Sequence, residues 1–363
     1  MGDEYLKLIR MSDGHYKQIE IDCEICNRHD FELMLDKGRI GYHGQYGPIS
    51  VMQCRYCGHV MLNPRYEPQF YIDYYQKVYK DVGNFGGEKP KPGFLERQIE
   101  RGEAVRRFLA ARHKINKGTM LDLGCSYGAT TIPFRDNGWN VQGIDPEEAS
   151  VGYGKRELGL PVQYGCAEML PYSDNSMDLV ICLGTLEHVY NLHNAMSQVW
   201  RVLKKNGHLF IRMRNNRPWG LIWEYYNANH YRFFSEATHR LVVMRYGFKV
   251  VEYTEDEIEG IPGHRYLVCR KTGKPSFELV ERAISRGLRD SPEALKRYLK
   301  EHHQRFIEQS KGLLDLAQQC NGDLSRIAEE IDSGRFHYTI LDGDRREAVK
   351  RALLEAGWVL QKE

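Results

Sequence analysis

The stretch Met120-Leu121-Asp122-Leu123-Gly124-Cys125-Ser126-Tyr127-Gly128 decides the fold of this 363-residue chain. Its first half is apolar and ends at a glycine, which is typical of a buried strand running into a turn. Glycines at 124 and 128 let the backbone approach a ligand closely. The helix expected to follow would offer free backbone N–H groups at its first turn. Alone, a glycine-rich turn between a strand and a helix is weak evidence of a binding site.

The chain around this turn alternates short apolar runs with amphipathic segments. Such alternation predicts an α/β fold with a mostly parallel sheet and helices on both faces. The last two strands follow each other closely, which indicates an antiparallel pair at one edge. The expected strands are Thr119–Leu123, Asn140–Ile144, Val162–Gly165, Leu179–Leu183, His208–Arg212, Lys249–Tyr253 and Arg265–Arg270, and the expected helices are Phe94–His113, Ala129–Asn137, Glu147–Leu158, Leu192–Leu203 and Ser235–Tyr246.

The strand after the glycine turn reads VQGID and ends in Asp145, about 20 residues further on. A carboxylate at this place suits the two vicinal hydroxyls of a ribose. The spacing from Gly124 to Gly128 is shorter than in the GxGxxG pattern of nicotinamide cofactors, and no phosphate cradle is evident. Asp178 precedes another expected strand, where a structural cap is favoured over a ligand contact.

Two cysteine pairs, Cys23-x2-Cys26 and Cys54-x2-Cys57, stand 27 residues apart. Each pair suits one tight turn that aims two thiolates at one ion, and two such turns complete a four-thiolate site of the structural zinc type. Gly58 relieves crowding where the backbone turns toward sulfur. The long gap is expected to hold a hairpin. Two buried pairs of free cysteines and a rubredoxin-like iron site are the alternatives.

Changes in composition divide the chain into three parts. Residues 1–85 are expected to form a zinc-ribbon domain with a Tyr-rich segment. A Gly- and Pro-rich hinge over 86–93 separates it from an α/β domain over 94–273. Residues 274–363 are richer in charge and are expected to be mainly helical, with helices over 275–286, 292–320 and 345–356; they carry no readable motif.

The overall composition is that of a globular protein, with 42% hydrophobic and 28% charged residues. The net charge of +2 excludes a nucleic-acid clamp that works through bulk charge. No apolar run is long enough to span a membrane, and the N-terminus lacks the apolar core of a signal peptide. Nine cysteines, an odd number, argue against a secreted disulfide framework. These features predict a cytoplasmic protein.

Several segments, in this order, resemble class I S-adenosylmethionine-dependent methyltransferases. They are LDLGCSYG with the strand-end Asp145, AEMLPYSDNSMDLVICLGTLEHV (167–189), WRVLKKNGHLFIRMRN (200–215) and HYRFFSEATHRLVVMRYGF (230–248). The resemblance covers roughly 95–272 and implies a Rossmann-like sheet. The N-terminal cysteine pairs with the Tyr-rich segment are similar to zinc-ribbon methyltransferases of bacterial sugar, surface-polysaccharide and natural-product metabolism. Residues 274–363 do not match the larger second domain of the sugar C-methyltransferases.

The resemblance implies S-adenosyl-L-methionine as cofactor. Its methionine half would lie along the first glycine motif, its ribose would bind Asp145, and its adenine would lie near Pro146 and the 167–169 segment. The fourth strand would end beneath the transferable methyl group. The implied cofactor-binding residues are Asp122, Gly124, Cys125, Ser126, Tyr127, Gly128, Asp145, Pro146, Ala167, Glu168, Met169, Leu183 and Gly184, and the implied zinc ligands are Cys23, Cys26, Cys54 and Cys57.

Two clusters are candidates for catalysis. Glu187 and His188 follow the fourth strand, where the resemblance implies the substrate cavity. Because an oxygen nucleophile needs a base of near-neutral pKa, His188 is the first candidate base. A role in packing or in orienting the loop is the alternative for His188, and Glu187 is also a candidate metal ligand. His230 and Tyr231, beside Arg232, form the second cluster.

The sequence therefore predicts a methyltransferase for a small-molecule or glycan acceptor, such as a nucleotide-linked sugar or a surface-polysaccharide precursor. An RNA or protein methyltransferase that binds its substrate through the ribbon is the alternative, with Arg55, Arg65 and the 97–112 helix supplying positive charge. The balanced net charge disfavours nucleic acid without excluding it. A non-catalytic cofactor-binding scaffold is the third reading. The C-terminal helices leave a homodimer open as one oligomeric state.

Overall fold

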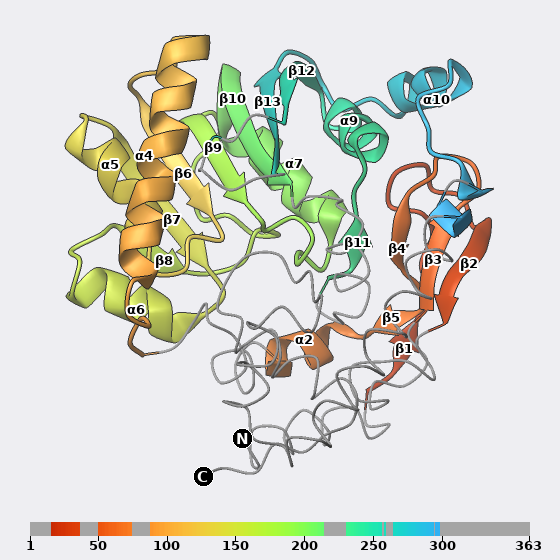
Figure 1. Ribbon diagram of the computed structural model, residues 1–363, viewed down its shortest axis with the longest axis horizontal. Helices are drawn as coiled ribbons and strands as arrows, with labels where there is room; N and C mark the ends of the chain where they lie inside the picture. Colours follow the sequence, from red (N-terminus) through yellow and green to blue (C-terminus); the bar gives the residue numbers. More distant parts are fainter. Residues whose placement is uncertain are drawn as a thin grey trace, which may run out of the picture.

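A seven-stranded mixed sheet forms the centre of the protein (Figure 1). The computed structural model describes residues 16–36, 50–74, 88–213, 230–255, 258, 264–293 and 295–297. Five neighbouring strands are parallel, whereas β13 runs antiparallel to β10, and β12 runs antiparallel to β13. The order across the sheet is β12 (Phe248–Thr254), β13 (Arg265–Lys271), β10 (Leu203–Met213), β9 (Met177–Leu183), β6 (Thr119–Leu123), β7 (Asn140–Asp145) and β8 (Val162–Tyr164).

The strand order reverses at β6. From this strand the chain first builds β7 and β8 on one side and then crosses over to build β9 and β10 on the other. In open parallel sheets, ligands bind beyond the carboxyl ends of the strands at such a reversal, because the flanking connections leave in opposite directions. The loops after β6, β7 and β9 are therefore where a ligand is expected.

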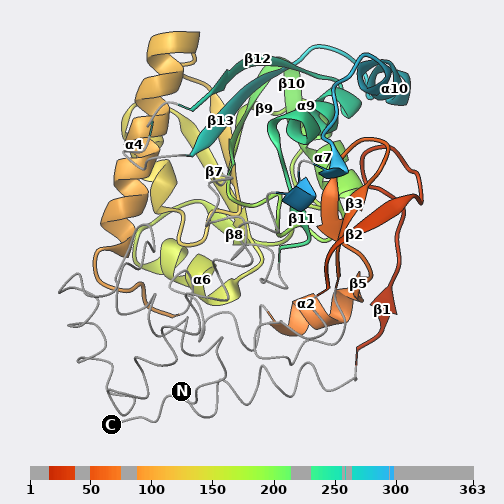
Figure 2. The same cartoon turned by 45° about the vertical axis from the view of Figure 1, so that its right-hand side comes forward.

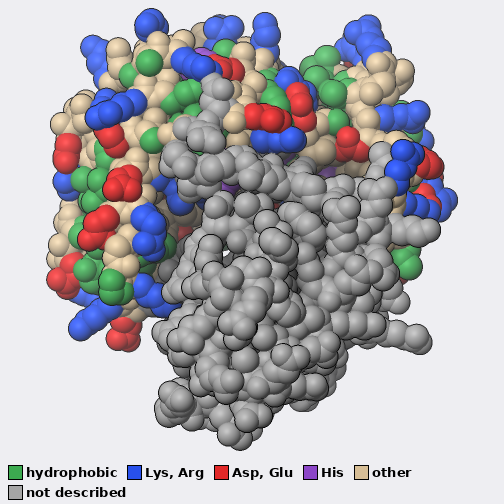
Figure 3. All heavy atoms as spheres, in the orientation of Figure 1, with side chains coloured by type: hydrophobic (Ala, Val, Ile, Leu, Met, Phe, Trp, Pro, Cys, Tyr) green, Lys and Arg blue, Asp and Glu red, His purple; other side chains and the backbone are tan. Residues whose placement is uncertain are grey.

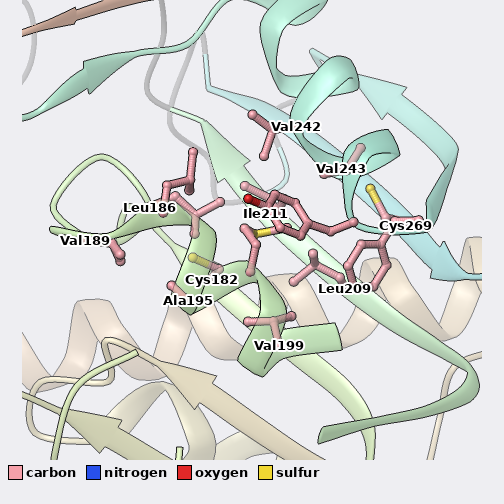
Figure 4. Packing of buried hydrophobic residues seen from close by; sticks show 14 of the residues in the cluster. Cys182, Leu186, Val189, Ala195, Val199, Leu209, Ile211, Val242, Val243 and Cys269 are labelled. Carbon is pink, nitrogen blue, oxygen red and sulfur yellow. The ribbon is translucent and has the colours of Figure 1, made fainter. Parts of the chain in front are cut away.

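Helices cover both faces of the sheet, as the sequence predicts. Figure 2 shows α4 (Phe94–His113) along one face, where Val105 and Leu109 pack against β6, β7 and β9. On the other face lie α7 (Leu192–Val202), α9 (Glu236–Arg245) and α10 (Phe277–Ser285). Figure 4 shows this second core between α7, α9 and strands β9, β10 and β13, with Val199, Val242 and Ile211 pointing into it. Through Val151, α6 (Glu148–Arg156) packs against β8.

The predicted helix over 129–137 differs in its first turn. Residues Ala129–Thr131 form a 3₁₀ turn, and the α-helix α5 runs only over Ile132–Asp136. Pro133 explains the late start, since proline lacks an N–H and fits only the first turn of a helix. The Thr131 hydroxyl donates to the Gly128 carbonyl at 2.7 Å and tightens the preceding turn. Ser235 caps α9 in a reciprocal pair with Thr238, which explains why this helix begins where it does.

The four cysteines lie in a small β-rich unit, residues 16–36 and 50–74, called here the cysteine unit. Its elements are β1 (Gln18–Ile19), β2 (Phe31–Asp36), β3 (Ser50–Cys54), β4 (Val60–Leu62), β5 (Arg65–Tyr66) and α2 (Pro68–Tyr74). Strands β2 and β3 pair antiparallel, which confirms the predicted hairpin. The unit packs beside the sheet domain (Figures 1 and 2), and β11 (Arg232–Phe233) adds a fourth strand to its sheet by pairing with β4.

The predicted helices over 292–320 and 345–356 lie largely outside the described residues, as does most of the region 274–363. Its first helix, α10, is described. There Glu281 accepts a hydrogen bond from the Tyr56 hydroxyl of the cysteine unit at 2.8 Å. Among the described residues, no helix is both long and apolar enough to cross a bilayer.

Candidate functional site

The loop after β6 is shaped by three residues with positive φ, Gly124 at 81°, Ser126 at 52° and Gly128 at 81°. At Gly124 a side chain is excluded twice, by this backbone conformation and by Thr185, whose Oγ1 would lie 2.4 Å from a Cβ. The Thr185 hydroxyl donates to the Leu123 carbonyl at 2.7 Å. The loops after β6 and β9 are therefore in direct contact at the reversal of strand order.

Asp145 ends β7 and fixes the glycine loop. Its Oδ2 accepts a hydrogen bond from the Ser126 N–H at 2.8 Å, and its Oδ1 accepts one from the Glu147 N–H at 2.9 Å. Glu147 in turn caps α6 by accepting from the N–H groups of Ala149 and Ser150. An ionised carboxylate has about four acceptor sites, so these two bonds leave capacity for a pair of ligand hydroxyls.

Asp122, which is 2% exposed, and Asp145 form an electrostatically unfavourable pair in the free protein. Burial raises the pKa of Asp122 to about 7, and the nearby charge of Asp145 adds to the effect. Burial also raises the pKa of Asp145 to about 6, although the bonds from Ser126 and Glu147 oppose that rise. Two carboxyls with raised pKa values favour a ligand that brings positive charge or hydroxyl donors.

The other residues expected around a cofactor lie in three different environments. Pro146 is exposed, Ala167 is 8% exposed and Met169 is 77% exposed. Glu168 has a partner that the sequence does not reveal, because its Oε1 accepts a hydrogen bond from the Asn191 N–H at 3.1 Å. Glu168 thereby ties the loop after β8 to the start of α7.

The predicted catalytic residues come together at the carboxyl end of β9. The rings of His188 and His230 meet edge to face, with centroids 4.4 Å apart. The Tyr231 N–H donates to the Glu187 carbonyl at 2.9 Å. At Gly184, where φ is +82°, a Cβ would lie 2.9 Å from Nη2 of Arg212, which donates to the Leu183 carbonyl at 2.8 Å. The two predicted catalytic clusters therefore lie at one site, the carboxyl end of β9.

A buried charge network that sequence reasoning missed lies behind this place. Arg232 is 1% exposed, and its Nε and Nη2 donate to both carboxylate oxygens of Glu24 at 2.8 and 2.7 Å. Burial is the largest single influence and would raise the pKa of Glu24. The charge of Arg232, the side-chain interaction with His59, the hydrogen bonds from Arg232 and the charge of Arg65 together hold that pKa well below its ordinary value. Arg65, 5% exposed, also bonds Glu24 at 3.2 Å, so it is not part of an open basic surface.

The four predicted metal ligands form one buried cluster. All four sulfur atoms lie within 4.8 Å of one another, and the Cys23–Cys57 and Cys26–Cys54 sulfurs are 3.5 and 3.4 Å apart. A tetrahedral zinc–thiolate site needs sulfur separations of about 3.8 Å, so the donor set and its size fit. Gly58, after the second pair, has φ of +80°, and a Cβ there would lie 2.5 Å from the Asp290 backbone nitrogen.

Comparisons with known proteins agree on the central domain. Residues 121–211 match a family model described as a methyltransferase domain. The chain is 29% identical over 132 residues to a probable S-adenosylmethionine-dependent methyltransferase of Mycolicibacterium smegmatis, covering 36% of this chain and 51% of that protein. It is 32% identical over 105 residues to the ubiquinone biosynthesis O-methyltransferase of Dechloromonas aromatica, covering 27% of this chain and 45% of that protein.

Among solved structures, the 1,6-didemethyltoxoflavin-N1-methyltransferase of Burkholderia thailandensis is similar with a TM-score of 0.39 and 17% identity, covering 48% of this chain and 78% of that one. The chain spans about half the length of the curated relatives it matches. Residues 121–211 thus carry the sequence pattern of a methyltransferase domain, and they lie within the Rossmann-like sheet.

Proposed function

We propose that this chain transfers a methyl group from S-adenosylmethionine to a small-molecule or glycan acceptor, and that the four cysteines hold a structural zinc ion. One observation carries the proposal: the Asp145 carboxylate lies against the glycine loop at the strand-order reversal, inside a segment that matches a methyltransferase domain. Four thiolates would fill all the coordination positions of the ion and leave none for a substrate or a water molecule, so we assign the ion a structural role.

The cofactor would bind at residues that already share contacts. Asp145 would accept the ribose hydroxyls, and the loop Gly124–Gly128 would follow the methionine part. Asp122 and Asp145 would both gain from the positive charges of the ligand, since their raised pKa values reflect uncompensated burial. When bound, S-adenosylmethionine supplies a methyl group on a sulfonium, open to in-line displacement. The remaining residues toward it would be Cys125, Tyr127, Pro146, the segment 167–169, Leu183 and Gly184.

Glu187 and His188 would face the acceptor, whereas His230 and Tyr231, which are 2% and 1% exposed, pack against them. His188 is the proposed base for an oxygen nucleophile, and the edge-to-face contact with His230 would hold its ring in place. The cofactor already carries an activated methyl group. The main task of the protein would therefore be to align the acceptor atom with the methyl carbon and the sulfur for in-line displacement.

A small acceptor is favoured over a nucleic acid by the charges of the described surface. Figure 3 shows Lys and Arg side chains interspersed with Asp and Glu over the described part of one face. Arg65, one of the cations that would favour RNA, is buried against Glu24, and Arg55 has the carboxylates of Asp30 and Glu32 nearby. The curated relatives include an enzyme named for ubiquinone biosynthesis, and quinols are small molecules. A nucleotide-linked sugar or a surface-polysaccharide precursor fits the same description.

Cofactor affinity should depend on pH in the neutral range. Because the pKa of Asp122 is raised to about 7 and that of Asp145 to about 6, protons compete with a cationic ligand as the pH falls. We expect binding of S-adenosylmethionine to weaken about tenfold from pH 8 to pH 6. Calorimetric titration at both pH values measures this, and Asp122→Asn should flatten the dependence. A constant dissociation constant would remove the carboxylate pair from the site.

The raised pKa values of Asp122 and Asp145 also predict how the free energy of unfolding of the cofactor-free protein changes with pH. A raised pKa means that the folded state binds protons more tightly than the unfolded state. The contribution of these two groups to the free energy of unfolding is therefore fully present below their unfolded pKa of about 4 and is lost as the pH rises through 6 and 7.

Turnover is the test of the proposed function. The metal-loaded protein would be incubated with S-adenosylmethionine and separate pools of nucleotide sugars, quinols and transfer RNA, with release of S-adenosylhomocysteine followed by mass spectrometry. We expect release with a small-molecule pool and its loss in His188→Ala. Release with RNA alone would contradict the proposed acceptor class, and the absence of release from every pool would contradict the enzyme itself.

A further inference from the structure

Arg232 connects the cysteine unit to the loop after β9. It lies in β11, whose residues pair with Met61 and Val60 of β4. On one side its guanidinium grips the carboxylate of Glu24 through two bonds. On the other side Nη1 donates to the carbonyls of Leu186 and Val189 at 2.6 and 2.5 Å. One buried side chain therefore bridges two segments that are far apart in sequence.

The two ends of this bridge are the metal knuckle and the proposed catalytic loop. Glu24 stands between Cys23 and Cys26, inside the turn that presents two of the four thiolates. Residues 186–190, called here the 186–190 loop, contain Glu187 and His188. Figure 4 shows Leu186 and Val189 on this loop beside the buried core, where they are 2% and 5% exposed. Core packing holds the loop's apolar side chains, and Arg232 holds its carbonyls.

We propose that Arg232 is a positioning residue through which the ion in the four-cysteine site orders the 186–190 loop. The bridge depends on the place of Glu24, and the turn around Glu24 is closed by the ion. Without the ion, the two thiolates no longer fix this turn, and the Glu24 carboxylate is held by its side-chain bonds to Arg232 and Arg65. A shift of Glu24 would leave the buried charge of Arg232 with backbone carbonyls alone, a costly arrangement. The consequence for methyl transfer rests on the proposed methyl transfer, and the part of the ion rests on the proposed zinc site, whereas the contacts of Arg232 with Glu24 and with the loop carbonyls rest on neither.

Arg245 offers a matched control. It also binds the knuckle, with Nη1 donating to the carbonyls of Glu24 and Ile25 at 3.1 and 2.5 Å, and with Nη2 donating to the Asn27 side chain. Its bonds within the described residues reach no member of the 186–190 loop. If Arg232 merely docks the cysteine unit onto the sheet domain, both arginines should behave alike; if it positions the loop, they should differ.

Hydrogen–deuterium exchange of the cofactor-free, zinc-loaded protein tests this. The reporters are the amides of His188, Asn191 and Tyr231, which donate to Thr185, Glu168 and Glu187. In Arg232→Gln and in Glu24→Gln we expect these amides to exchange at least about tenfold faster, with β7 unchanged. Arg245→Gln should leave them within about twofold of the wild-type protein. Chelation of zinc from the wild-type protein should give the fast exchange, and chelation should add nothing further in Arg232→Gln.

Two checks keep the outcome decisive. Cobalt in place of zinc should give the same thiolate absorption in Glu24→Gln as in the wild-type protein, which shows that the ion still binds. Should Arg232→Gln fail to fold, Glu24→Gln decides. Slow exchange at the three amides in Glu24→Gln or after chelation would overturn the proposal, as would equally fast exchange in Arg245→Gln. Failure of the wild-type protein to bind S-adenosylhomocysteine would instead overturn the proposed function and leave the exchange result standing.

Discussion

Alanine in place of Asp145 should weaken binding of S-adenosylmethionine by at least about a hundredfold. The carboxylate would accept two ribose hydroxyls, and hydrogen bonds to a charged group contribute about 1.5–3 kcal/mol each. Every 1.4 kcal/mol or so corresponds to a tenfold change in the dissociation constant. Asp145 also fixes the glycine loop through the Ser126 and Glu147 N–H groups, so its loss disturbs the neighbouring backbone as well. Calorimetric titration measures the loss.

Two variants guard this result against trivial unfolding. Asp145→Asn keeps the shape and one acceptor oxygen, and it should fall between the wild-type protein and Asp145→Ala. Asp178→Asn is the matched control, because Asp178 also accepts bonds in the sheet, from the Thr119 N–H and from Lys204, but at the opposite ends of the strands. Equal affinities of the wild-type protein and a folded Asp145→Ala would show that this carboxylate does not bind the cofactor.

Removing one cysteine of the cluster is expected to have the largest effect on stability. The wild-type protein should contain about one zinc per chain, and structural zinc sites contribute about 10 kcal/mol or more to folding. Cys57→Ser should therefore lose the metal and unfold the cysteine unit, whose small core cannot replace that contribution. Metal analysis and a calorimetric melt would record the loss of zinc and a separate transition at lower temperature.

Cys166→Ser is the control for this experiment, because Cys166 is exposed and lies outside the cluster. It should keep both the zinc and the wild-type melting profile. Two results would rule out a structural ion at these cysteines. One is wild-type protein that folds fully without any metal, and the other is a melting profile of Cys57→Ser identical to that of the wild-type protein.

The strands and helices of the sheet domain could be predicted because the local spacing of apolar residues specifies them. Strand β6 has the predicted ends, and the remaining sheet strands were predicted within a few residues, apart from the early start of β10 at Leu203. The cysteine cluster was equally readable, since metal-ligand spacing is a local feature. The 3₁₀ turn at Ala129–Thr131 could not be foreseen from apolar spacing, which does not report the position of the first α-helical hydrogen bond.

The buried charge network of Arg232 and Glu24 could not be predicted from the sequence, for a different reason. The sequence places Arg232 beside His230 and Tyr231 in a candidate catalytic cluster, and nothing in this segment indicates a buried ion pair. Its burial depends on Glu24, which lies 208 residues earlier in the chain. Only the docking of β11 onto β4 brings the two together. The hydrogen bond of Glu168 could not be predicted for the same reason, since its partner Asn191 lies 23 residues later in the chain, after β9.

Calorimetric titration of the zinc-loaded protein with S-adenosylmethionine and with its demethylated product S-adenosylhomocysteine tests the central claim most directly. We expect one site of micromolar affinity for each, with the product bound as tightly as the substrate or more tightly, and no heat from a nicotinamide dinucleotide. A folded, metal-loaded protein that binds neither compound would contradict it.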